Sequence, residues 1–202
     1  VFMISANKGW AVGGSGKIIH WNGTIWKNAS SPTTKSLYSV FMTSANDGWA
    51  VGFDGTIIRW NGTRWNTVSS PTTNYLESVF MVSASNGWAV GWHGTITHWN
   101  GTAWSNATSP TTNSLYSVFM TSANDGWAVG FDGTIIHWNG TEWSNATSPT
   151  ANYLESVFMT SANDGWAVGG LGTIIHWDGT KWNNVTSPNE MSWLLSVFMV
   201  SA

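Results

Sequence analysis

No cysteine occurs in this sequence, so disulfides cannot stabilise the fold, and thiol redox or cysteine–zinc chemistry is excluded. Charge is also scarce, because Lys, Arg, Asp and Glu make up 8% of the residues and the formal net charge is −3. The seven basic residues are scattered from Lys8 to Lys181, whereas a nucleic-acid-binding protein clusters them. We therefore expect no nucleic-acid partner.

Long hydrophobic runs are absent as well. A membrane-spanning helix needs about 18 or more consecutive apolar residues, and the apolar stretches here are short and interrupted by Ser, Gly or Asn. We expect no membrane span. The low charge, together with abundant Ser, Thr, Asn and Gly, favours an extracellular or cell-surface location. The sequence begins at Val1, inside a repeat and without a signal peptide, so we expect a fragment or a processed product.

The dominant feature of the chain is an internal repeat. The tripeptide Val-Phe-Met starts at residues 1, 40, 79, 118, 157 and 197, so the spacing is 39 residues four times and 40 residues once. A fixed period of this length indicates one supersecondary unit copied along the chain. We predict a single domain over residues 1–202, with repeats starting at 1, 40, 79, 118 and 157 and an extra first strand at residues 196–202.

Each repeat has the pattern of four short strands. In the second repeat, residues 39–44, 49–51, 56–60 and 63–68 are rich in β-forming residues. Residues 45–48 and 53–55 carry the Asn, Asp and Gly of tight turns. Asn61-Gly62 is the pair that favours a two-residue type I′ hairpin turn. No segment has the apolar period of a helix, so we expect about twenty strands and no helix longer than a turn.

The strands are apolar on both faces, as the adjacent Ile57 and Ile58 show. Such a sheet must be covered on both sides, and sheets packed face to face around an axis provide this in a β-propeller. We predict an all-β fold, a β-propeller of five four-stranded antiparallel blades with a surplus sixth copy of the first strand. The linkers alternate between Leu-Tyr-Ser and Leu-Glu-Ser, which suggests amplification in double units, so a fragment of a longer array with an open or larger ring is the alternative.

The stretch Gly48-Trp49-Ala50-Val51-Gly52, followed by Gly55-Thr56-Ile57-Ile58, resembles the repeats of the photosystem II stability/assembly factor-like propellers and their Asp-box (BNR) relatives. The resemblance covers the whole chain and implies the propeller fold. It is weak for function, because such repeats serve receptors, assembly factors, lectins and hydrolases alike. The hairpin at residues 60–65 is one residue shorter than an Asp-box, and Arg59 and Arg64 are too few for the arginine triad of a sialidase.

Most of the 17 tryptophans recur at three positions of the repeat, which indicates a structural core. Trp92 lies out of this register, in the turn Trp92-His93-Gly94, where other repeats have Gly or Phe. The pair Phe-Asp occupies the same turn in the second and fourth repeats. We therefore name as candidate ligand-binding residues Trp92, His93, Phe53, Asp54, Phe131 and Asp132.

Two other repeated positions carry ionisable residues. His20, His98, His137 and His176 share one position with Arg59, and equivalent positions on different blades are too far apart to converge on one metal ion. We expect each histidine to be bonded to backbone between blades or at the rim. Asp47, Asp125 and Asp164 occupy one turn position, where an aspartate bonds its own backbone. We expect no catalytic, metal or cofactor site.

Because every copy carries nearly the same residues, no single place stands out as a catalytic centre. We predict a non-catalytic β-propeller binding or scaffold module of a secreted or cell-surface protein, with an unidentified protein or glycan partner. The alternative is a lectin-like carbohydrate-binding propeller with several equivalent sites, and a glycoside-active enzyme ranks lowest, since no paired carboxylates are evident. The surplus strand predicts self-association, because an unpaired strand edge recruits another chain.

Overall fold

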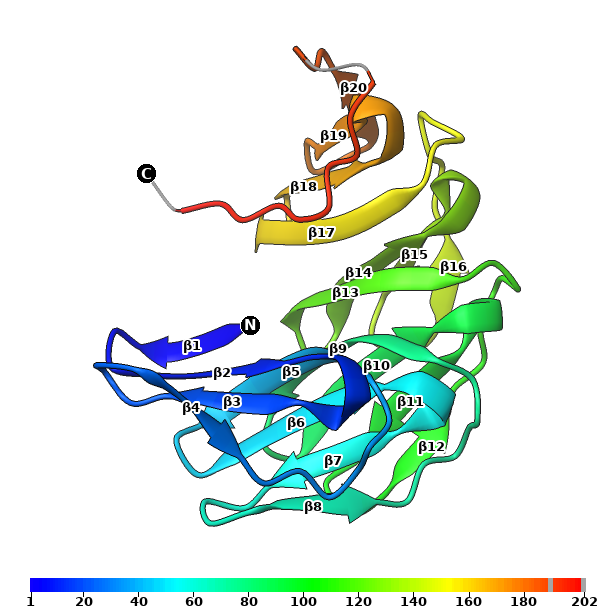
Figure 1. The fold of residues 1–202 in the computed structure, drawn as a ribbon. Coiled ribbons are helices and arrows are strands. Elements are labelled where there is room, and N and C mark those ends of the chain that lie inside the picture. The colour runs from blue at the N-terminus through cyan, green and yellow to red at the C-terminus, as the bar shows by residue number, and fades with distance from the viewer. Residues whose placement is uncertain (189–190, 201–202) are drawn as a thin grey trace. The chain divides into compact units, whose positions relative to one another are not determined.

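The computed structural model describes residues 1–188 and 191–200, and over this part the chain forms twenty strands. They make five four-stranded antiparallel sheets, and each sheet is a meander whose strands follow chain order (Figure 1). This confirms the predicted all-β architecture of five four-stranded blades. The longest helical elements among the described residues are 3-10 turns of three residues, and no helix there is long and apolar enough to cross a membrane.

The sheets are numbered one to five in chain order, and their strands have the following bounds. Sheet one contains β1 (Phe2–Ser5), β2 (Lys8–Val12), β3 (Ile18–Trp21) and β4 (Trp26–Ala29). Sheet two contains β5 (Leu37–Ser44), β6 (Asp47–Gly52), β7 (Ile57–Trp60) and β8 (Trp65–Val68). Sheet three contains β9 (Leu76–Ser83), β10 (Asn86–Gly91), β11 (Ile96–Trp99) and β12 (Trp104–Asn106). Sheet four contains β13 (Leu115–Ser122), β14 (Asp125–Gly130), β15 (Ile135–Trp138) and β16 (Trp143–Asn145). Sheet five contains β17 (Leu154–Ser161), β18 (Asp164–Gly169), β19 (Ile174–Trp177) and β20 (Trp182–Val185).

The turn between the second and third strands of each sheet is a three-residue 3-10 element with an unusual backbone. Its middle residue is not glycine yet has a positive φ, as at Asp54 with φ 56°. Gly55 follows with φ 66°, and a Cβ there would lie 2.0 Å from the carbonyl oxygen of Thr72. The turn therefore needs a glycine at its last position, while its middle position tolerates a side chain. The five turns are η1 (Gly14–Gly16), η2 (Phe53–Gly55), η3 (Trp92–Gly94), η4 (Phe131–Gly133) and η5 (Gly170–Gly172).

The Asn-Gly turn between the third and fourth strands differs from the prediction of a type I′ turn. Trp60 pairs with Trp65, so the loop has four residues. Gly62 has φ 91°, but Asn61 is not among the residues with positive φ, as a type I′ turn would require. Instead, the Asn61 side-chain oxygen accepts hydrogen bonds from the backbone N–H groups of Thr63 and Arg64. The local side-chain bond of asparagine thus replaces the tighter turn.

The chain divides into two compact units. Unit one contains residues 1–91 and 96–107, and unit two contains residues 92–95 and the chain from residue 108 onward. The extent of a single domain therefore stays a prediction.

The core of each unit lies between neighbouring sheets and is built from the registered tryptophans. In unit one, Trp49 is fully buried and packs against Trp99 and Trp104 of the next sheet, with ring centroids 4.7 and 5.4 Å apart. In unit two, Trp127 packs against Trp177 and Trp182 with the same two separations. The predicted assignment to the core is confirmed for the buried members of this set, Trp49, Trp99, Trp104, Trp127 and Trp182, but it is wrong for Trp26 of sheet one, which is 41% exposed.

Inside each unit the first strands of neighbouring sheets are joined by a repeated contact. The Val79 N–H donates to the Ser39 hydroxyl at 3.2 Å, and the Val157 N–H donates to the Ser117 hydroxyl at the same distance. The phenylalanine that follows each of these valines packs at a tilt against its counterpart, as Phe80 does against Phe41 with ring centroids 4.7 Å apart. The same contact therefore joins sheets two and three in unit one and sheets four and five in unit two.

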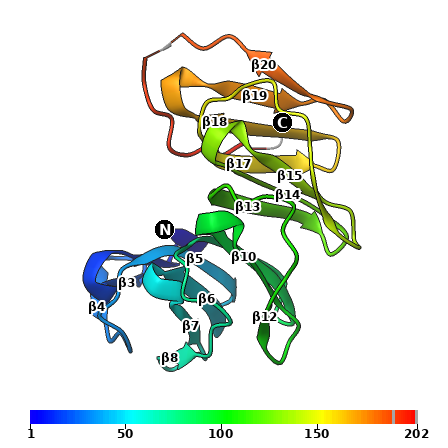
Figure 2. The same cartoon turned by 90° about the vertical axis from the view of Figure 1, so that its right-hand side faces the viewer.

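The sixth copy of the first strand, predicted at residues 196–202, is not a strand over its described part, and residues 201 and 202 lie outside the described chain. Figures 1 and 2 show the segment beside β17 in unit two. The Val197 N–H donates to the Ser156 hydroxyl at 3.2 Å, and Phe198 packs on Phe158 at 5.1 Å. The segment therefore occupies the place of the first strand of a following sheet. It lacks strand structure because residues 191–200 pair with no second strand.

Candidate functional site

The first candidate site is a cluster of polar side chains at the turn between the first and second strands. In sheet two, Asp47 accepts hydrogen bonds from the Thr43 hydroxyl at 2.5 Å and from the Arg59 Nε at 2.7 Å. In sheet four, Asp125 contacts Thr121 and the His137 Nε2, the latter at 2.7 Å. Sheet five repeats the cluster with Thr160, Asp164 and His176, and the His176 Nε2 lies 2.6 Å from the carboxylate.

This geometry corrects two expectations from the sequence. His137 and His176 are bonded to side-chain carboxylates rather than to backbone, and the aspartates bond other side chains rather than their own backbone. The hairpin register causes the difference: Trp127 pairs with His137 across β14 and β15, which brings the histidine within reach of Asp125. The hydrogen bonds from Thr160 and His176 hold the pKa of Asp164 below its usual range.

The cluster contains a hydroxyl, a carboxylate and an imidazole, but it does not have the connectivity of a nucleophilic triad. In such a triad the base contacts the hydroxyl, and the carboxylate orients the base. Here the Thr121 hydroxyl and the His137 imidazole both contact Asp125. The imidazole is therefore not placed to take the proton of the threonine hydroxyl, as the base of a triad would be. The cluster ties the turn to the third strand.

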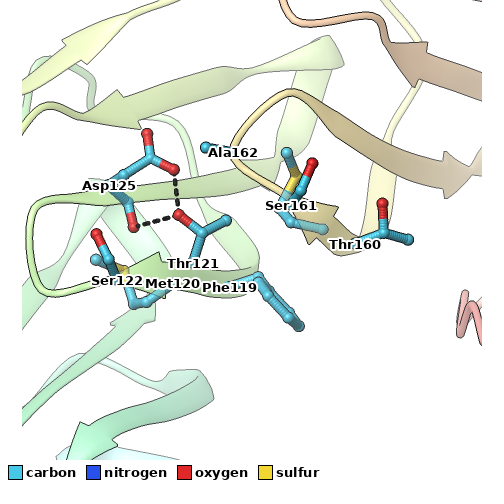
Figure 3. Close-up of a pocket in the computed structure, with 9 residues that line it drawn as sticks. Phe119, Met120, Thr121, Ser122, Asp125, Thr160, Ser161 and Ala162 are labelled. Atoms are coloured by element: carbon cyan, nitrogen blue, oxygen red, sulfur yellow. Dashed lines mark hydrogen bonds between the residues drawn. The ribbon is translucent and has the colours of Figure 1, made fainter. Parts of the chain in front are cut away.

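A pocket opens beside this cluster in unit two (Figure 3). It has a volume of about 420 Å³ and is lined on one side by Phe119 to Ser122 with Asp125 and on the other by Met159 to Ala162. Figure 3 shows Asp125 bonded to Thr121 on one wall, with Thr160 and Ser161 on the other. An equivalent pocket of about 390 Å³ lies between sheets two and three. Each has one lining carboxylate, so neither offers the facing pair that glycoside hydrolysis needs.

Ionisable side chains do not gather into a metal centre in the described part of the chain. No group of three or more His, Asp or Glu residues there is arranged to hold an ion. Histidine and aspartate instead form one pair in sheet four and one in sheet five, and in sheet two Arg59 takes the place of the histidine.

Sheet one departs from the pattern because Lys8 occupies the aspartate position. The His20 Nε2 is buried and makes no hydrogen bond. Burial and the neighbouring Lys8 ammonium together lower the pKa of His20. The same position in sheet three holds Asn86, whose side-chain oxygen lies 2.8 Å from the His98 Nε2.

Lys8→Asp is expected to stabilise unit one by about 1 kcal/mol, because it supplies the missing partner of His20 and removes a repulsive charge. The pKa of His20 should rise at the same time. Urea unfolding and an NMR titration of His20 measure the two effects. Lys17→Asp, which makes the same charge change at an exposed site beside η1, is the control and should leave both unchanged. Equal effects from the two variants would contradict this assignment.

The stability of the fold is expected to depend on pH through His98. Burial lowers the pKa of His98 below its unfolded value of about 6.5. As the pH falls, the unfolded state therefore binds a proton at His98 before the folded state does. The stability that neutral His98 contributes is complete above the unfolded pKa and is lost as the pH falls through the folded pKa. Melting temperatures measured downward from pH 7.5 should decline, and His98→Gln should flatten that part of the profile. A decline that is unchanged in His98→Gln would contradict this origin.

The second candidate site is formed by the 3-10 turns, which carry all six residues predicted to bind ligand. Phe53 and Phe131 are exposed and pack against Tyr75 and Tyr153, with ring centroids 4.4 and 4.7 Å apart. Trp92 is 41% exposed. Each of the three aromatic residues thus presents part of its ring to solvent.

The residues that follow these aromatics have different surroundings. Asp54 forms an exposed ion pair with Lys35 at 2.5 Å. Asp132 has φ 55°, the left-handed conformation of this turn position. His93 has φ 56°, its N–H donates to the Ser114 hydroxyl at 3.3 Å, and its ring meets Trp92 edge-on at 6.3 Å. Unit one therefore holds Phe53 and Asp54, and unit two holds the other four candidates.

Sequence reasoning missed the pocket that unit two builds at its last turn. Tyr153, Leu171 and Trp193 line it together with Ala151, Asn152 and Gly170, and its volume is about 270 Å³. Tyr153 meets Trp193 edge-on at 5.5 Å, on the ring that also packs against Phe131. Two signals in the sequence point to it: Trp193 lies outside the tryptophan register, and Leu171 stands where Asp54 and Asp132 stand in other repeats.

Comparisons with known proteins place this chain by its fold. No protein-family model matches the sequence, and no curated protein sequence matches it. Solved structures do match: the RRP9 WD40 repeats with a TM-score of 0.78 and U3-55K with 0.77, each at 10% identity, over 96% of this chain and 67% of the other chain. YCF48 bound to D1 peptide matches with a TM-score of 0.50 at 15% identity, over 90% of this chain and 78% of that one.

The fold and the comparisons together define the class. Five four-stranded antiparallel meanders, similar to WD40 and YCF48 propellers, make this chain a β-propeller repeat protein with tryptophan-rich repeats. The fold does not decide the function of a propeller, which depends on the sites it carries.

Proposed function

We propose that this chain is a non-catalytic binding module and that the pocket of Tyr153, Leu171 and Trp193 receives an apolar side chain of a partner polypeptide. The observation that carries the proposal is Leu171. It is 56% exposed and has φ 53°, although leucine in the left-handed region costs about 1–2 kcal/mol. An exposed leucine in this conformation contributes little to folding, and strained residues of this kind concentrate at binding sites.

The composition of the pocket supports a polypeptide ligand. Its lining residues carry no charge, and the Asn152 amide already donates to the Thr173 hydroxyl at 2.9 Å. A sugar would need several free hydrogen-bonding groups beside the aromatic rings, whereas an apolar side chain needs none. A volume of about 270 Å³ suits one or two side chains. A peptide is also the ligand recorded for YCF48, one of the proteins that share this fold.

The non-catalytic part of the proposal rests on the polar clusters. The Thr121 hydroxyl and the His137 imidazole both contact Asp125 rather than each other, and each of the two pockets beside such clusters has a single lining carboxylate. These arrangements support a structural role for the ionisable residues, and a glycoside-active enzyme ranks lowest.

The experiment is selection of a random-peptide phage library on the immobilised chain. Enriched peptides should share an aromatic or aliphatic anchor, and synthetic peptides of that sequence should bind Trp193→Ala at least about tenfold more weakly. Leu171→Asn should weaken binding as well, because it keeps the turn and removes the apolar contact. Phe53→Ala in unit one is the matched control and should leave the affinity unchanged. No enrichment, or enriched peptides that bind Trp193→Ala equally well, would overturn the proposal.

A lectin-like function is the second candidate, favoured by one observation. Phe53, Trp92 and Phe131 are exposed aromatic rings at the same position of three repeats, and such rings can stack on sugars. A glycan array would detect it. Binding that falls stepwise as each of the three is changed to alanine would support several equivalent sites, and an unreactive array would reject this function.

We further propose that the protein is secreted or located at the cell surface. The support is compositional, namely few charges and abundant Ser, Thr, Asn and Gly. Detection of the chain in the medium or on intact cells of its source tests this, and its recovery only from the cell interior would reject it.

A further inference from the structure

The chain contains eight Asn-x-Ser/Thr triplets, and the structure separates most of them into two sets. Such a triplet is the acceptor of an N-linked glycan, which is attached at the asparagine Nδ2. The turn set lies between the third and fourth strands and consists of Asn22, Asn61, Asn100 and Asn139. The strand set lies in the fourth strand and consists of Asn106, Asn145 and Asn184. The remaining triplet begins at Asn28 in β4, whose Oδ1 accepts a hydrogen bond from the Lys17 Nζ at 3.4 Å.

In the turn set, the side-chain oxygen is engaged and the nitrogen is not. The Asn61 Oδ1 accepts hydrogen bonds from the backbone N–H groups of Thr63 and Arg64 at 3.1 and 3.0 Å, and from the Thr63 hydroxyl at 2.8 Å. The same oxygen of Asn100 and of Asn139 accepts two backbone bonds at 2.9 and 3.0 Å. Among the described residues, none accepts a hydrogen bond from the Asn61 Nδ2, and Asn61 is exposed. This nitrogen is therefore open to an incoming group.

The orientation of the turn amide is set inside one sheet. Gly62 has φ 91°, and the equivalent Gly101 and Gly140 have φ 92° and 93°. A Cβ on Gly62 would lie 3.1 Å from the Cβ of Asn46, which belongs to the turn between the first two strands of the same sheet. The groups that bond the Asn61 oxygen come from its own hairpin. The exposure of the Asn61 nitrogen thus follows from the fold of a single repeat.

In the strand set, the nitrogen is engaged. The Asn106 Nδ2 donates to the carbonyl oxygen of Pro71 at 3.1 Å. Each member makes this bond at the same distance to the proline 35 positions before it: Asn106 to Pro71, Asn145 to Pro110 and Asn184 to Pro149. Both partners belong to the same unit in every case. A sugar on this nitrogen would have to lie against the linker that leads into the sheet.

Sheet five shows that the turn does not need the amide nitrogen. Asp178 stands there in place of the asparagine, and its Oδ1 accepts the backbone N–H groups of Thr180 and Lys181 at 2.9 and 3.0 Å. Gly179 follows with φ 89°, so the backbone of the turn is unchanged. Folding of the turn therefore uses the side-chain oxygen, and the nitrogen of Asn61 has no structural role that a modification would disturb.

We propose that the asparagines of the turn set are acceptor sites for N-linked glycans. In the transfer, the asparagine Nδ2 forms a bond to the anomeric carbon of an oligosaccharide carried on a lipid diphosphate. The bond from that carbon to the phosphate oxygen breaks, its electron pair leaves with the diphosphate, and one amide proton passes to a base of the transferase. The proposal rests on the proposed extracellular or cell-surface location, because this donor serves chains on the secretory route.

The first test measures access to the two sets in the folded chain, with a soluble N-glycosyltransferase and UDP-glucose as the probe. Mass spectrometry should find glucose on Asn61, Asn100 and Asn139 at least about fivefold more often than on the strand set, whose nitrogens must first break a hydrogen bond. Synthetic peptides of residues 58–66 and 103–111 should be modified at similar rates, since both contain an Asn-x-Thr triplet. Equal occupancy of the two sets in the folded chain, or the same preference in the peptides, would overturn the proposal.

The second test produces the chain with an added signal peptide in a secreting eukaryotic host, which supplies the lipid-linked donor. The secreted chain should carry glycans at the turn set, and Asn61→Asp should remove one of them, because it keeps the turn bonds as Asp178 does but lacks the acceptor nitrogen. Asn106→Asp is the matched control and should leave the number of glycans unchanged. A secreted chain without glycans at the turn set, or an equal loss in both variants, would overturn the proposal. Neither result bears on the proposed location, because the added signal peptide sets the route.

Discussion

Trp127→Ala is expected to destabilise unit two by about 3–5 kcal/mol, the cost of removing a large aromatic side chain from a core. Trp127 is 3% exposed and contacts the rings of His137, Trp177 and Trp182. Alanine would leave a cavity between sheets four and five that neighbouring backbone cannot fill. Urea unfolding followed by circular dichroism measures the loss, and Trp49→Ala should reproduce it in unit one.

His137→Ala is the control in the same sheet. It removes one hydrogen bond to Asp125 and one ring contact, so it should cost only about 1 kcal/mol. Asp125 keeps its bond to Thr121 and is partly exposed, so the loss leaves no buried, unpaired carboxylate. If both variants lost the same stability, tryptophan would not be the main core residue of the repeat.

Gly133→Ala is expected to destabilise unit two by about 2–4 kcal/mol, from left-handed strain together with a steric clash. Gly133 has φ 65°, and an added Cβ would lie 2.0 Å from the carbonyl oxygen of Thr150. Backbone rather than a flexible side chain opposes the methyl group, so the turn itself must shift. The melting temperature of unit two should fall accordingly.

Asp132→Gly tests the neighbouring position of the same turn. Asp132 also has a positive φ, 55°, but its side chain is accommodated. Glycine there relieves strain, so stability should change by less than about 1 kcal/mol. A large loss at Asp132, or none at Gly133, would mean that the turn does not need its glycine.

The fold could be predicted from the sequence because its signals are local and repeated. The Val-Phe-Met tripeptide, the Asn-Asp-Gly turn and the tryptophan positions recur in phase, and each fixes a strand or a turn without knowledge of distant contacts. The burial of Trp49 also followed, since a repeated aromatic in a chain without disulfides is a core residue.

Contacts that depend on hairpin register were not predictable in the same way. The partnership of Asp125 with His137 requires β14 and β15 to align Trp127 with His137, and residue spacing alone does not set that alignment. The Asn61 turn also departed from expectation, because its side-chain oxygen accepts two backbone hydrogen bonds. The pocket of Tyr153, Leu171 and Trp193 joins residues from three separate segments, which no repeat position reveals.

The serine–valine contact between first strands has a consequence for how such chains change length. Its two atoms belong to residues 40 positions apart in both units, and the partners have the same chemistry each time. A genetic exchange that removes or inserts one whole repeat therefore reconnects the same donor to the same acceptor. Within a unit, the junctions of the shortened or lengthened chain would be as well matched as before, so the number of repeats can change while the structure of each repeat is preserved.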